Sequence, residues 1–344
     1  MPLLPAGSRQ SAHSSWRKIV QVGPPPTNPT PGPSVVISRV MKGETVLTIG
    51  TFDGVHRGHR AILERVRECA EALRIPSVAY TFELPPRAAI EGRNPRLLLP
   101  PQIRYRLIGR YVDRVVPTSF SDVRSLSPER FIAEVIVGEL AAKAIVVGER
   151  FKFGRGREGD IEALRAGASR YGYTVEGVPP VTVRGEVVSS TLIRDLVTEG
   201  RIGEASRLLG RFPALFGKVI RGDRIGEMLG YPTANLRIPP EILLPASGVY
   251  LARAFILEGW EDGLLYIGTR PSVGGKELRC ELHLFGEVRS DLYGLDLEIH
   301  ILERLREDMT FPSLDHLRVQ IGRDVERGRA RLRDYPPIPE RIGG

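Results

Sequence analysis

Two histidines stand three residues apart in GTFDGVHRGH, residues 50–59, directly after a run that predicts a buried strand. At positions i and i+3, His56 and His59 fall on one face of the first turn of a helix. Two imidazoles there could donate hydrogen bonds to phosphate oxygens and stabilise charge that develops during transfer at a phosphate. A strand-to-helix turn with incidental polar residues and a metal site are the alternative interpretations.

The surroundings of the histidines favour the phosphate site. Ligands of open α/β sheets bind beyond the carboxyl ends of strands, where helix N-termini present amide groups to anions. Gly50, Gly54 and Gly58 lie in this turn, and glycine lets the backbone approach a phosphate closely. The turn therefore has both the location and the residue types of an anion site.

A second segment has the residue types of an anion clamp. In VVSSTLIR, 187–194, Ser189, Ser190 and Thr191 stand at a predicted helix start, and Arg194 follows one turn later. Hydroxyls, free N–H groups and a guanidinium can together bind a phosphate, with ordinary helix capping as the alternative. Between the two segments, GERFKFGRGREGD (148–160) contains G-x-G-x-x-G. Because FKF separates these glycines from their strand, we interpret them as a basic loop near the phosphates rather than a dinucleotide fingerprint.

A third dense patch is GKVIRGDRIGEMLGYPTANL, residues 217–236. Thr233 and Asn235 are two residues apart, so in an extended strand both side chains leave the same face. A hydroxyl and an amide oxygen there could hold Mg²⁺ bridging nucleotide phosphates. Gly222 and Gly226 lie in the preceding loop, where bare backbone could contact phosphates. A Pro-Thr-Asn turn between strands is the alternative interpretation.

One glutamate has the position of a general base. In LRCELHLFG, 278–286, Glu281 alternates with Cys280 and Leu282 and so projects away from the apolar face. There it could accept a proton from a substrate hydroxyl. A surface glutamate is the alternative.

The elements that would position these residues fall into two halves. From residue 44 to 209, strand-like runs alternate with segments of helical periodicity, which predicts a parallel α/β sheet. The predicted strands are 44–50, 76–82, 142–148 and 173–181, and the predicted helices include 127–140, 190–199 and 202–209. Later strand-like runs follow one another without helices, which predicts a small antiparallel barrel ending in a helix over 313–332; the runs are 216–221, 248–257, 263–269, 278–286 and 295–306. In the last run Asp296, Glu298 and His300 alternate with apolar residues, which predicts a half-buried strand with these three facing solvent.

The domain boundaries follow from this change of rhythm. Residues 1–40 are rich in proline and hold no acidic residue, which predicts a disordered tail, with an organellar transit peptide as the alternative. We expect an α/β domain over 41–210, a barrel domain over 211–338 and a short tail over 339–344.

Composition limits the partners. The net charge of +8 is spread among interleaved acids, which favours small phosphorylated ligands over a nucleic-acid surface. No apolar run has transmembrane length and no apolar signal core stands near the N-terminus. Cys69 and Cys280 are far apart within apolar patterns, which indicates buried free thiols in a reducing compartment. We expect a cytoplasmic monomer or weak homo-oligomer that binds neither membrane nor nucleic acid.

Two resemblances follow from these motifs. The strand, G-T-F-D and H-x-G-H order resembles the nucleotidyltransferase superfamily, whose members move a nucleoside monophosphate to an acceptor phosphate. From about residue 44 to 335 the chain resembles the bifunctional bacterial riboflavin kinase/FAD synthetase family. The matching stretches come in the family's order and are TIGTFDGVHRGH, VVSSTLIR, LGYPTANL, SGVY, IGTRPS, ELHLF, DLYG and FPSLDHLRVQIGRD.

The resemblance implies an FMN adenylyltransferase in the first half, making FAD and pyrophosphate from ATP and FMN. His56, His59 and Arg194 would be its catalytic residues. Its ATP-binding residues would be Gly50, Thr51, Phe52, Gly54, Gly58, Ser189, Ser190 and Thr191. The second half would be a riboflavin kinase with Glu281 as base. There ATP would contact Gly222, Gly226, Pro232 and Thr233, and Mg²⁺ would bind Thr233 and Asn235.

Five positions depart from the family pattern. TFELPP (81–86) lacks the family's histidine, GERFKFG (148–154) has Arg150 where an acid is usual, and GEMLG (226–230) has Glu227 beside the implied phosphates. Tyr266 stands where asparagine is usual, and Gly286 where an acid is usual. Three alternatives stay open: retention of one activity only, a non-catalytic flavin- or nucleotide-binding sensor, and a different nucleotidyltransferase with a regulatory barrel.

Overall fold

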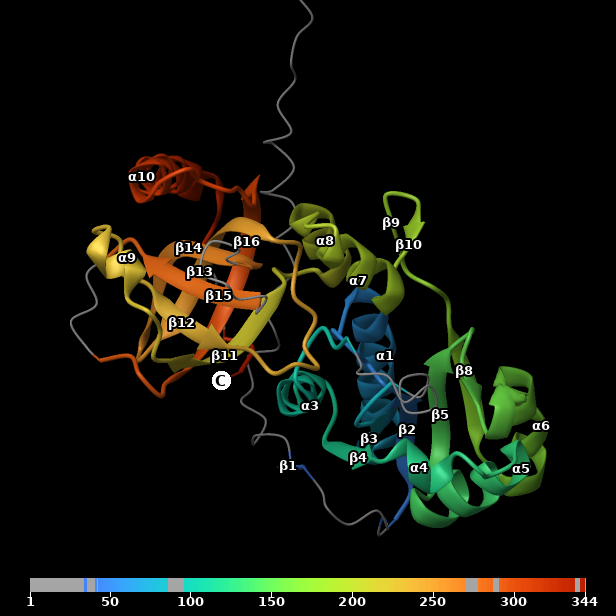
Figure 1. Ribbon diagram of the computed structural model, residues 1–344. Helices are drawn as coiled ribbons and strands as arrows, with labels where there is room; N and C mark the ends of the chain where they lie inside the picture. Colours follow the sequence, from blue (N-terminus) through green and yellow to red (C-terminus); the bar gives the residue numbers. More distant parts are fainter. Residues whose placement is uncertain are drawn as a thin grey trace, which may run out of the picture.

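The computed structural model describes residues 34–35, 41, 43–85, 96–269, 278–286, 291–337 and 341–343. Figure 1 shows a parallel sheet flanked by helices on one side of the molecule and a barrel on the other. Most of the tail predicted for residues 1–40 lies outside the described residues, as do positions 86–95 and 270–277. This arrangement is the α/β domain followed by an antiparallel barrel that the sequence predicts.

The sheet of the first domain is parallel throughout, in the order β1-β4-β3-β2-β5-β8. Its strands are β1 (Ser34–Val35), β2 (Thr45–Gly50), β3 (Ser77–Phe82), β4 (Arg114–Thr118), β5 (Ala142–Gly148) and β8 (Thr174–Val178). Its helices are α1 (Arg57–Leu73), α3 (Pro101–Gly109), α4 (Phe120–Val123), α5 (Pro128–Arg130), α6 (Ile161–Tyr171), α7 (Ser190–Thr198) and α8 (Ile202–Leu209). Two small hairpins complete it, β6 (Lys152–Phe153) with β7 (Gly159–Asp160) and β9 (Thr182–Val183) with β10 (Glu186–Val187).

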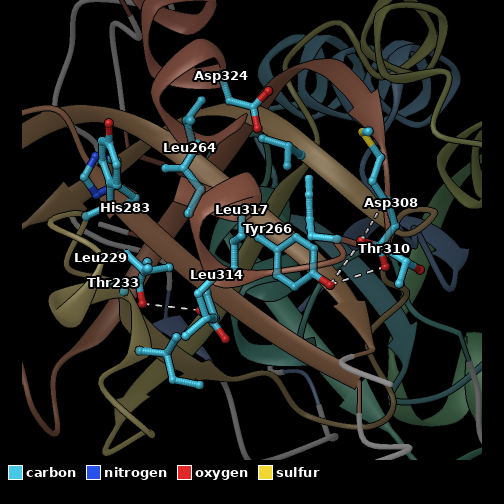
Figure 2. Close-up of a pocket in the computed structure, with 18 of the residues that line it drawn as sticks. Leu229, Thr233, Leu264, Tyr266, His283, Asp308, Thr310, Leu314, Leu317 and Asp324 are labelled. Carbon is cyan, nitrogen blue, oxygen red and sulfur yellow. Dashed lines mark hydrogen bonds between the residues drawn. The ribbon is translucent and has the colours of Figure 1, made fainter. Parts of the chain in front are cut away.

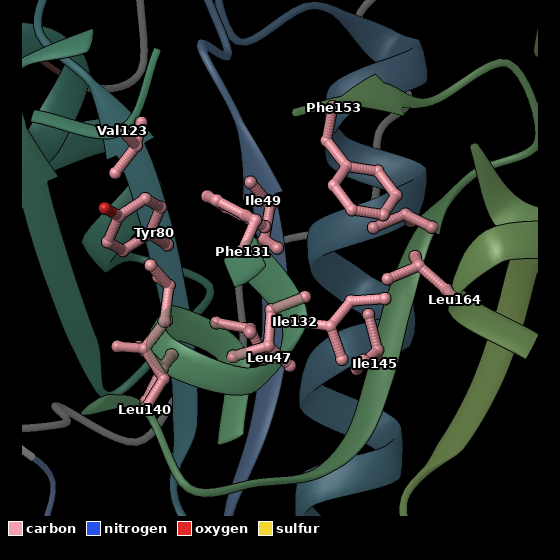
Figure 3. Packing of buried hydrophobic residues seen from close by; sticks show 14 of the residues in the cluster. Leu47, Ile49, Tyr80, Val123, Phe131, Ile132, Leu140, Ile145, Phe153 and Leu164 are labelled. Carbon is pink, nitrogen blue, oxygen red and sulfur yellow. The ribbon is translucent and has the colours of Figure 1, made fainter. Parts of the chain in front are cut away.

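Alternate residues of the central strands supply two cores. Val46 packs with α1 and α3 on one face of the sheet, whereas Leu47 and Ile49 pack on the other. Figure 3 shows the second face, where Phe131 and Ile132 lie against β2. Because a parallel strand is buried on both faces, its sequence is a continuous run of apolar residues. These strands are therefore recognisable in the sequence.

The helix predicted over 127–140 is present but is wound differently. It begins at α5, where the Ser127 side chain accepts from the Arg130 amide, and continues as a π-helix over Phe131–Glu139. Its bonds include one from the Leu140 amide to the Val135 carbonyl, at 2.9 Å. The residues that this helix buries are Phe131, Ile132, Val135 and Ile136, a short pattern that an α-helix would also produce, so the sequence does not distinguish the two windings.

The second domain is a closed antiparallel barrel in the order β11-β12-β15-β14-β13-β16. Its strands are β11 (Ala214–Ile220), β12 (Ala234–Arg237), β13 (Gly248–Ile256), β14 (Gly259–Thr269), β15 (Leu278–Leu284) and β16 (Asp296–Glu307). Its helices are α9 (Ile225–Met228) and α10 (Leu314–Arg331), followed by a 3₁₀ turn over Leu332–Asp334. The apolar face of the barrel strands forms its own core.

The prediction that Glu298 and His300 face solvent from β16 is wrong, since both are buried. The segment 341–343, called the strap below, covers them. The Glu298 carboxylate accepts hydrogen bonds from the Ile342 and Gly343 amides, at 2.7 and 2.9 Å, and contacts His300 Nε2 at 2.7 Å. The alternation of polar and apolar residues along one strand gives no information about a distant segment of the chain that packs over that strand.

The strap also contacts the first domain. Arg110, which follows α3, donates to the Arg341 carbonyl at 2.6 Å, and Arg106 of α3 donates to the Gly343 carbonyl. Ile342 packs in the same apolar cluster as Ile103. The strap therefore links the barrel to α3.

Two further predictions concern thiols and membranes. The cysteines form no disulfide; Cys280 is buried as predicted, whereas the prediction of burial is wrong for Cys69, which is partly exposed on α1. Among the described residues, no helix is both long and apolar enough to cross a bilayer.

Candidate functional sites

The paired histidines lie at the start of α1, beyond the carboxyl end of β2. His56 caps the helix, and its Nδ1 accepts the His59 amide hydrogen at 3.2 Å. The two rings stack with their centroids 3.5 Å apart. Because Nδ1 of His56 is an acceptor, the neutral ring carries its proton on Nε2, which is left to donate to a ligand.

Both imidazoles are held uncharged. Burial, together with Arg211 and other nearby arginines, lowers the pKa of His56 to about 3. Burial and His56 itself lower the pKa of His59 well below its usual value. The buried Nδ1 of His59 has no hydrogen-bond partner among the described residues. The pair therefore offers neutral donors at a helix N-terminus, where an anion is favoured.

Gly54 is favoured by its backbone conformation, and Gly50 and Gly58 pack closely against neighbouring rings. Gly54 has a φ of 80°. A Cβ on Gly50 would lie 3.1 Å from the Phe52 ring, and one on Gly58 would lie 3.3 Å from the His56 ring. The Thr51 carbonyl accepts from Thr81 on β3 at 3.3 Å. The turn is thus compact and fixed to the neighbouring strand.

The second anion segment meets this turn through Asp53. Arg194 Nη2 donates to the Asp53 carboxylate at 2.7 Å, and the Ser190 hydroxyl donates to the Asp53 carbonyl at 2.9 Å. Ser189 caps α7 by accepting from the Leu192 amide at 3.2 Å. The Thr191 side chain lies on the exposed side. The structure therefore brings 50–59 and 189–194 together, while two of the three hydroxyls are used within the protein.

Asp53 and Arg211 are site residues that the sequence reasoning missed. Arg211 donates to the Gly54 carbonyl at 2.6 Å and to the Val55 carbonyl at 3.3 Å. Burial lowers its pKa to about 10. The acid in G-T-F-D was a signal for Asp53, but nothing local marks Arg211 because its partners are distant in the sequence.

The G-x-G-x-x-G stretch is not a strand-to-helix turn. It forms the β6–β7 hairpin, closed by an ion pair of 3.0 Å between Lys152 and Asp160. Asp160 then caps α6 by accepting from the Glu162 and Ala163 amides. This geometry does not place the three glycines around a dinucleotide phosphate, in agreement with the interpretation from the sequence.

In the barrel, Thr233, Asn235 and Glu281 converge. The strand register sets Asn235 opposite Glu281, and the Thr233 hydroxyl donates to the Glu281 carboxylate at 3.3 Å. Glu281 is only 5% exposed, so it is not the surface glutamate of the alternative interpretation. A Cβ on Gly222 would lie 2.1 Å from the Asn235 amide nitrogen, and one on Gly226 would lie 3.0 Å from the Thr233 hydroxyl.

Gly226, Thr233 and Glu281 line a cavity of about 420 Å³, a size typical of small-molecule sites, whereas Asn235 and Gly222 lie outside its lining. Figure 2 shows its apolar lining and the Tyr266 hydroxyl turned towards Asp308; that hydroxyl lies 3.2 Å from the nearer carboxylate oxygen. Tyr266 also stands opposite Glu281 in the strand register. The other labelled lining residues are Leu229, Leu264, His283, Thr310, Leu314, Leu317 and Asp324. Pro232 borders this region, with its carbonyl 2.9 Å from His283 Nδ1.

Neutral imidazoles at the end of a strand and a buried carboxylate in a barrel cavity define a protein with two phosphate-transfer modules. Comparisons with known proteins agree. The family profile of FAD synthetase matches residues 39–192, and that of riboflavin kinase matches residues 209–332. The chain belongs to the bifunctional riboflavin kinase/FMN adenylyltransferase family.

Relatives with that description match most of the chain. The protein of Haemophilus influenzae is 34% identical over 85% of this chain and 96% of its own. Those of Escherichia coli K12 and Pseudomonas fluorescens are 36% and 38% identical over 84% and 83% of this chain, and over 93% and 92% of their own. A crystal structure described as a macrolide-efflux protein from Streptococcus pneumoniae superposes with a TM-score of 0.76 at 31% identity, over 84% of this chain and 95% of that one.

Proposed function

We propose that this chain makes both flavin cofactors in sequence. Residues 211–338 transfer the γ-phosphate of ATP to riboflavin, and residues 41–210 transfer the adenylyl group of a second ATP to the resulting FMN. The observation that carries the proposal is that one chain assembles both a neutral imidazole pair at a strand end and a buried Glu281–Thr233 pair in a cavity. The product of the barrel is thus the substrate of the parallel-sheet domain.

In adenylyl transfer, an oxygen of the FMN phosphate attacks the α-phosphorus of ATP, and the bond to pyrophosphate breaks. His56 and His59 donate hydrogen bonds to the ATP phosphates, and Arg194 supplies positive charge to them. The turn backbone at Gly50, Thr51, Phe52, Gly54 and Gly58 and the segment Ser189, Ser190 and Thr191 contact the nucleotide. Asp53 keeps Arg194 in position through their ion pair.

In phosphorylation, Glu281 accepts the proton of the terminal ribityl hydroxyl while that oxygen attacks the γ-phosphorus and ADP leaves. The Thr233 hydroxyl orients the carboxylate. Thr233 and Asn235 offer the oxygen ligands that suit Mg²⁺, and Asn235 is held over Gly222. The bound metal would neutralise phosphate charge, and Gly222, Gly226 and Pro232 are the further residues that would contact the ATP phosphates.

The test separates the two reactions by HPLC of flavins after incubation with Mg²⁺–ATP and either riboflavin or FMN. Wild type should make FMN and then FAD from riboflavin. Glu281→Gln should lower the kinase rate by about 10²–10⁴-fold and leave FAD synthesis from FMN intact. His59→Gln should lower the rate of FAD synthesis and leave the kinase rate intact. Glu258→Gln, in an exposed turn, is the matched control. No turnover of either flavin by wild type would overturn the proposal in favour of a sensor.

The chemistry of both reactions also bears on partners. The substrates are small molecules, and neither reaction uses a nucleic acid or a membrane. The unpaired thiols are compatible with action in the cytoplasm as a monomer or weak homo-oligomer. Sedimentation of the purified chain with and without FAD tests its oligomeric state.

A further inference from the structure

Arg104 is a fully buried arginine whose hydrogen bonds are incomplete. It lies on α3 and is 0% exposed. Nη2 donates to the Phe82 and Glu83 carbonyls, each at 2.8 Å. Nε and Nη1 have no hydrogen-bond partner among the described residues, and the guanidinium carbon lies 5.4 Å from the centroid of the neighbouring Tyr105 ring. A buried guanidinium without an anionic partner is costly, so its retention needs an explanation.

The position of Arg104 relates it to the histidine turn. Phe82 and Glu83 lie at the carboxyl end of β3, which is the neighbour of β2 in the sheet. Arg104 therefore stands beside the strand end from which the turn to His56 and His59 begins. Its charge is one of the influences that lower the pKa of His59. Both imidazoles are neutral and cannot balance the charge of a phosphate.

Adenylyl transfer to FMN brings two anionic phosphates together. The ATP phosphates have the helix N-terminus, the imidazoles and Arg194, but the incoming acceptor phosphate needs a cation of its own. Among the described residues, Arg104 is a buried cation beside the end of β3, and its Nε and Nη1 groups are available to donate hydrogen bonds. A desolvated guanidinium binds a phosphate strongly because charge-assisted hydrogen bonds gain strength away from water.

Building on the proposed function, we infer that Arg104 binds the phosphate of FMN through Nε and Nη1 in the adenylyltransferase site. It thereby selects a phosphorylated flavin over riboflavin as the adenylyl acceptor. The same donors could instead bind a phosphate of ATP. The KM values of FMN and ATP show which of the two substrates Arg104 binds.

The experiment measures kcat and the KM values of FMN and ATP for FAD formation in Arg104→Gln, Arg104→Lys and wild type. Arg104→Gln should raise the KM for FMN by roughly ten- to a hundredfold, the range of a lost charged hydrogen bond, with the KM for ATP within about threefold of wild type. Arg104→Lys should recover part of the loss. Arg124→Gln, an exposed arginine of the same domain, is the matched control.

Riboflavin kinase activity in the same samples reports on the barrel, and thermal melting reports on the parallel-sheet domain. If loss of the bonds to Phe82 and Glu83 unfolds Arg104→Gln, the Lys variant, which keeps the charge, supplies the KM comparison. A rise confined to the KM for ATP, or no change in either KM, would overturn the inference. Absence of FAD synthesis in wild type would instead reject the proposed function, so the two failures are distinguishable.

Discussion

In the folded chain, His56 and His59 are held neutral by burial and by neighbouring positive charge. The hydrogen bond from the His59 amide fixes the tautomer of His56, so a donor is present without any proton uptake. Positive charge then has to come from arginines, which do not titrate in the physiological range. In the reaction that we propose, the imidazoles supply hydrogen-bond donors, whereas Arg194, which is held by Asp53, supplies positive charge.

The lowered pKa of His56 makes stability depend on pH. An unfolded histidine titrates near 6.5, whereas in the fold the pKa is about 3. Between these values the unfolded chain binds more protons, so the stability conferred by the neutral ring is complete above about pH 6.5 and is lost as the pH falls. Between pH 7 and pH 5, wild type should lose about 2 kcal/mol more free energy of unfolding than His56→Gln. Urea titrations at both pH values measure this, and equal losses would contradict it.

At the scale of elements, the turn between β2 and α1 stores backbone strain. Phe52 and Val55 have φ values of 52° and 38°, and the left-handed region costs a non-glycine residue roughly 1–3 kcal/mol. Arg211 binds the Gly54 and Val55 carbonyls. These bonds offset the strain and hold His56 at the helix start.

Loss of this support should impair only one of the two activities. Arg211→Gln should slow FAD formation by about ten- to a hundredfold, since each charged hydrogen bond is worth about 1.5–3 kcal/mol, while riboflavin kinase activity persists. Arg333→Gln, exposed near the chain's last helix, controls for charge. No slowing of FAD formation in Arg211→Gln, or an equal slowing of both activities, would contradict the role of Arg211.

Much of the architecture was predictable because its elements have strong periodicity. Continuous apolar runs indicated β2, β3 and β5, and alternation indicated the barrel strands. The four-residue β12 and the two-residue β1 carry too short a pattern to be recognised as strands. Motif residues such as Thr233 and Glu281 were identifiable from spacing within one segment, and the register then sets them together. Arg104, Arg211 and the strap over Glu298 were not identifiable, because their partners lie far away in the sequence.

At the scale of the molecule, the strap makes the two domains share part of their core. Ile342 packs with apolar residues of both α3 and β11, among them Ile103 and Ala214. The Glu298 carboxylate accepts hydrogen bonds from the two strap amides of Ile342 and Gly343. Figure 1 places α3 and β11 on facing sides of the two domains.

Ile342→Ala should therefore weaken both domains together. The substitution should lower the free energy of unfolding by about 2–5 kcal/mol, as for other buried large-to-small changes. Kinase and FAD-forming activities should be lost at lower urea concentrations than in wild type, and by similar shifts. Val319→Ala, exposed on α10, should shift neither activity measurably. A shift confined to the kinase would show that the strap serves the barrel alone.

The bonds of Arg211 also bear on how such a gene can evolve. Arg211 lies within the segment matched to riboflavin kinase, 209–332, yet it completes a turn in the other module. A fission of the gene directly after α8, before residue 211, would keep Arg194 with the parallel-sheet domain. It would also leave the adenylyltransferase without the side chain that secures its histidines. The modules are therefore inherited most easily as a pair, and a descendant that encodes them separately would first need another residue to secure that turn.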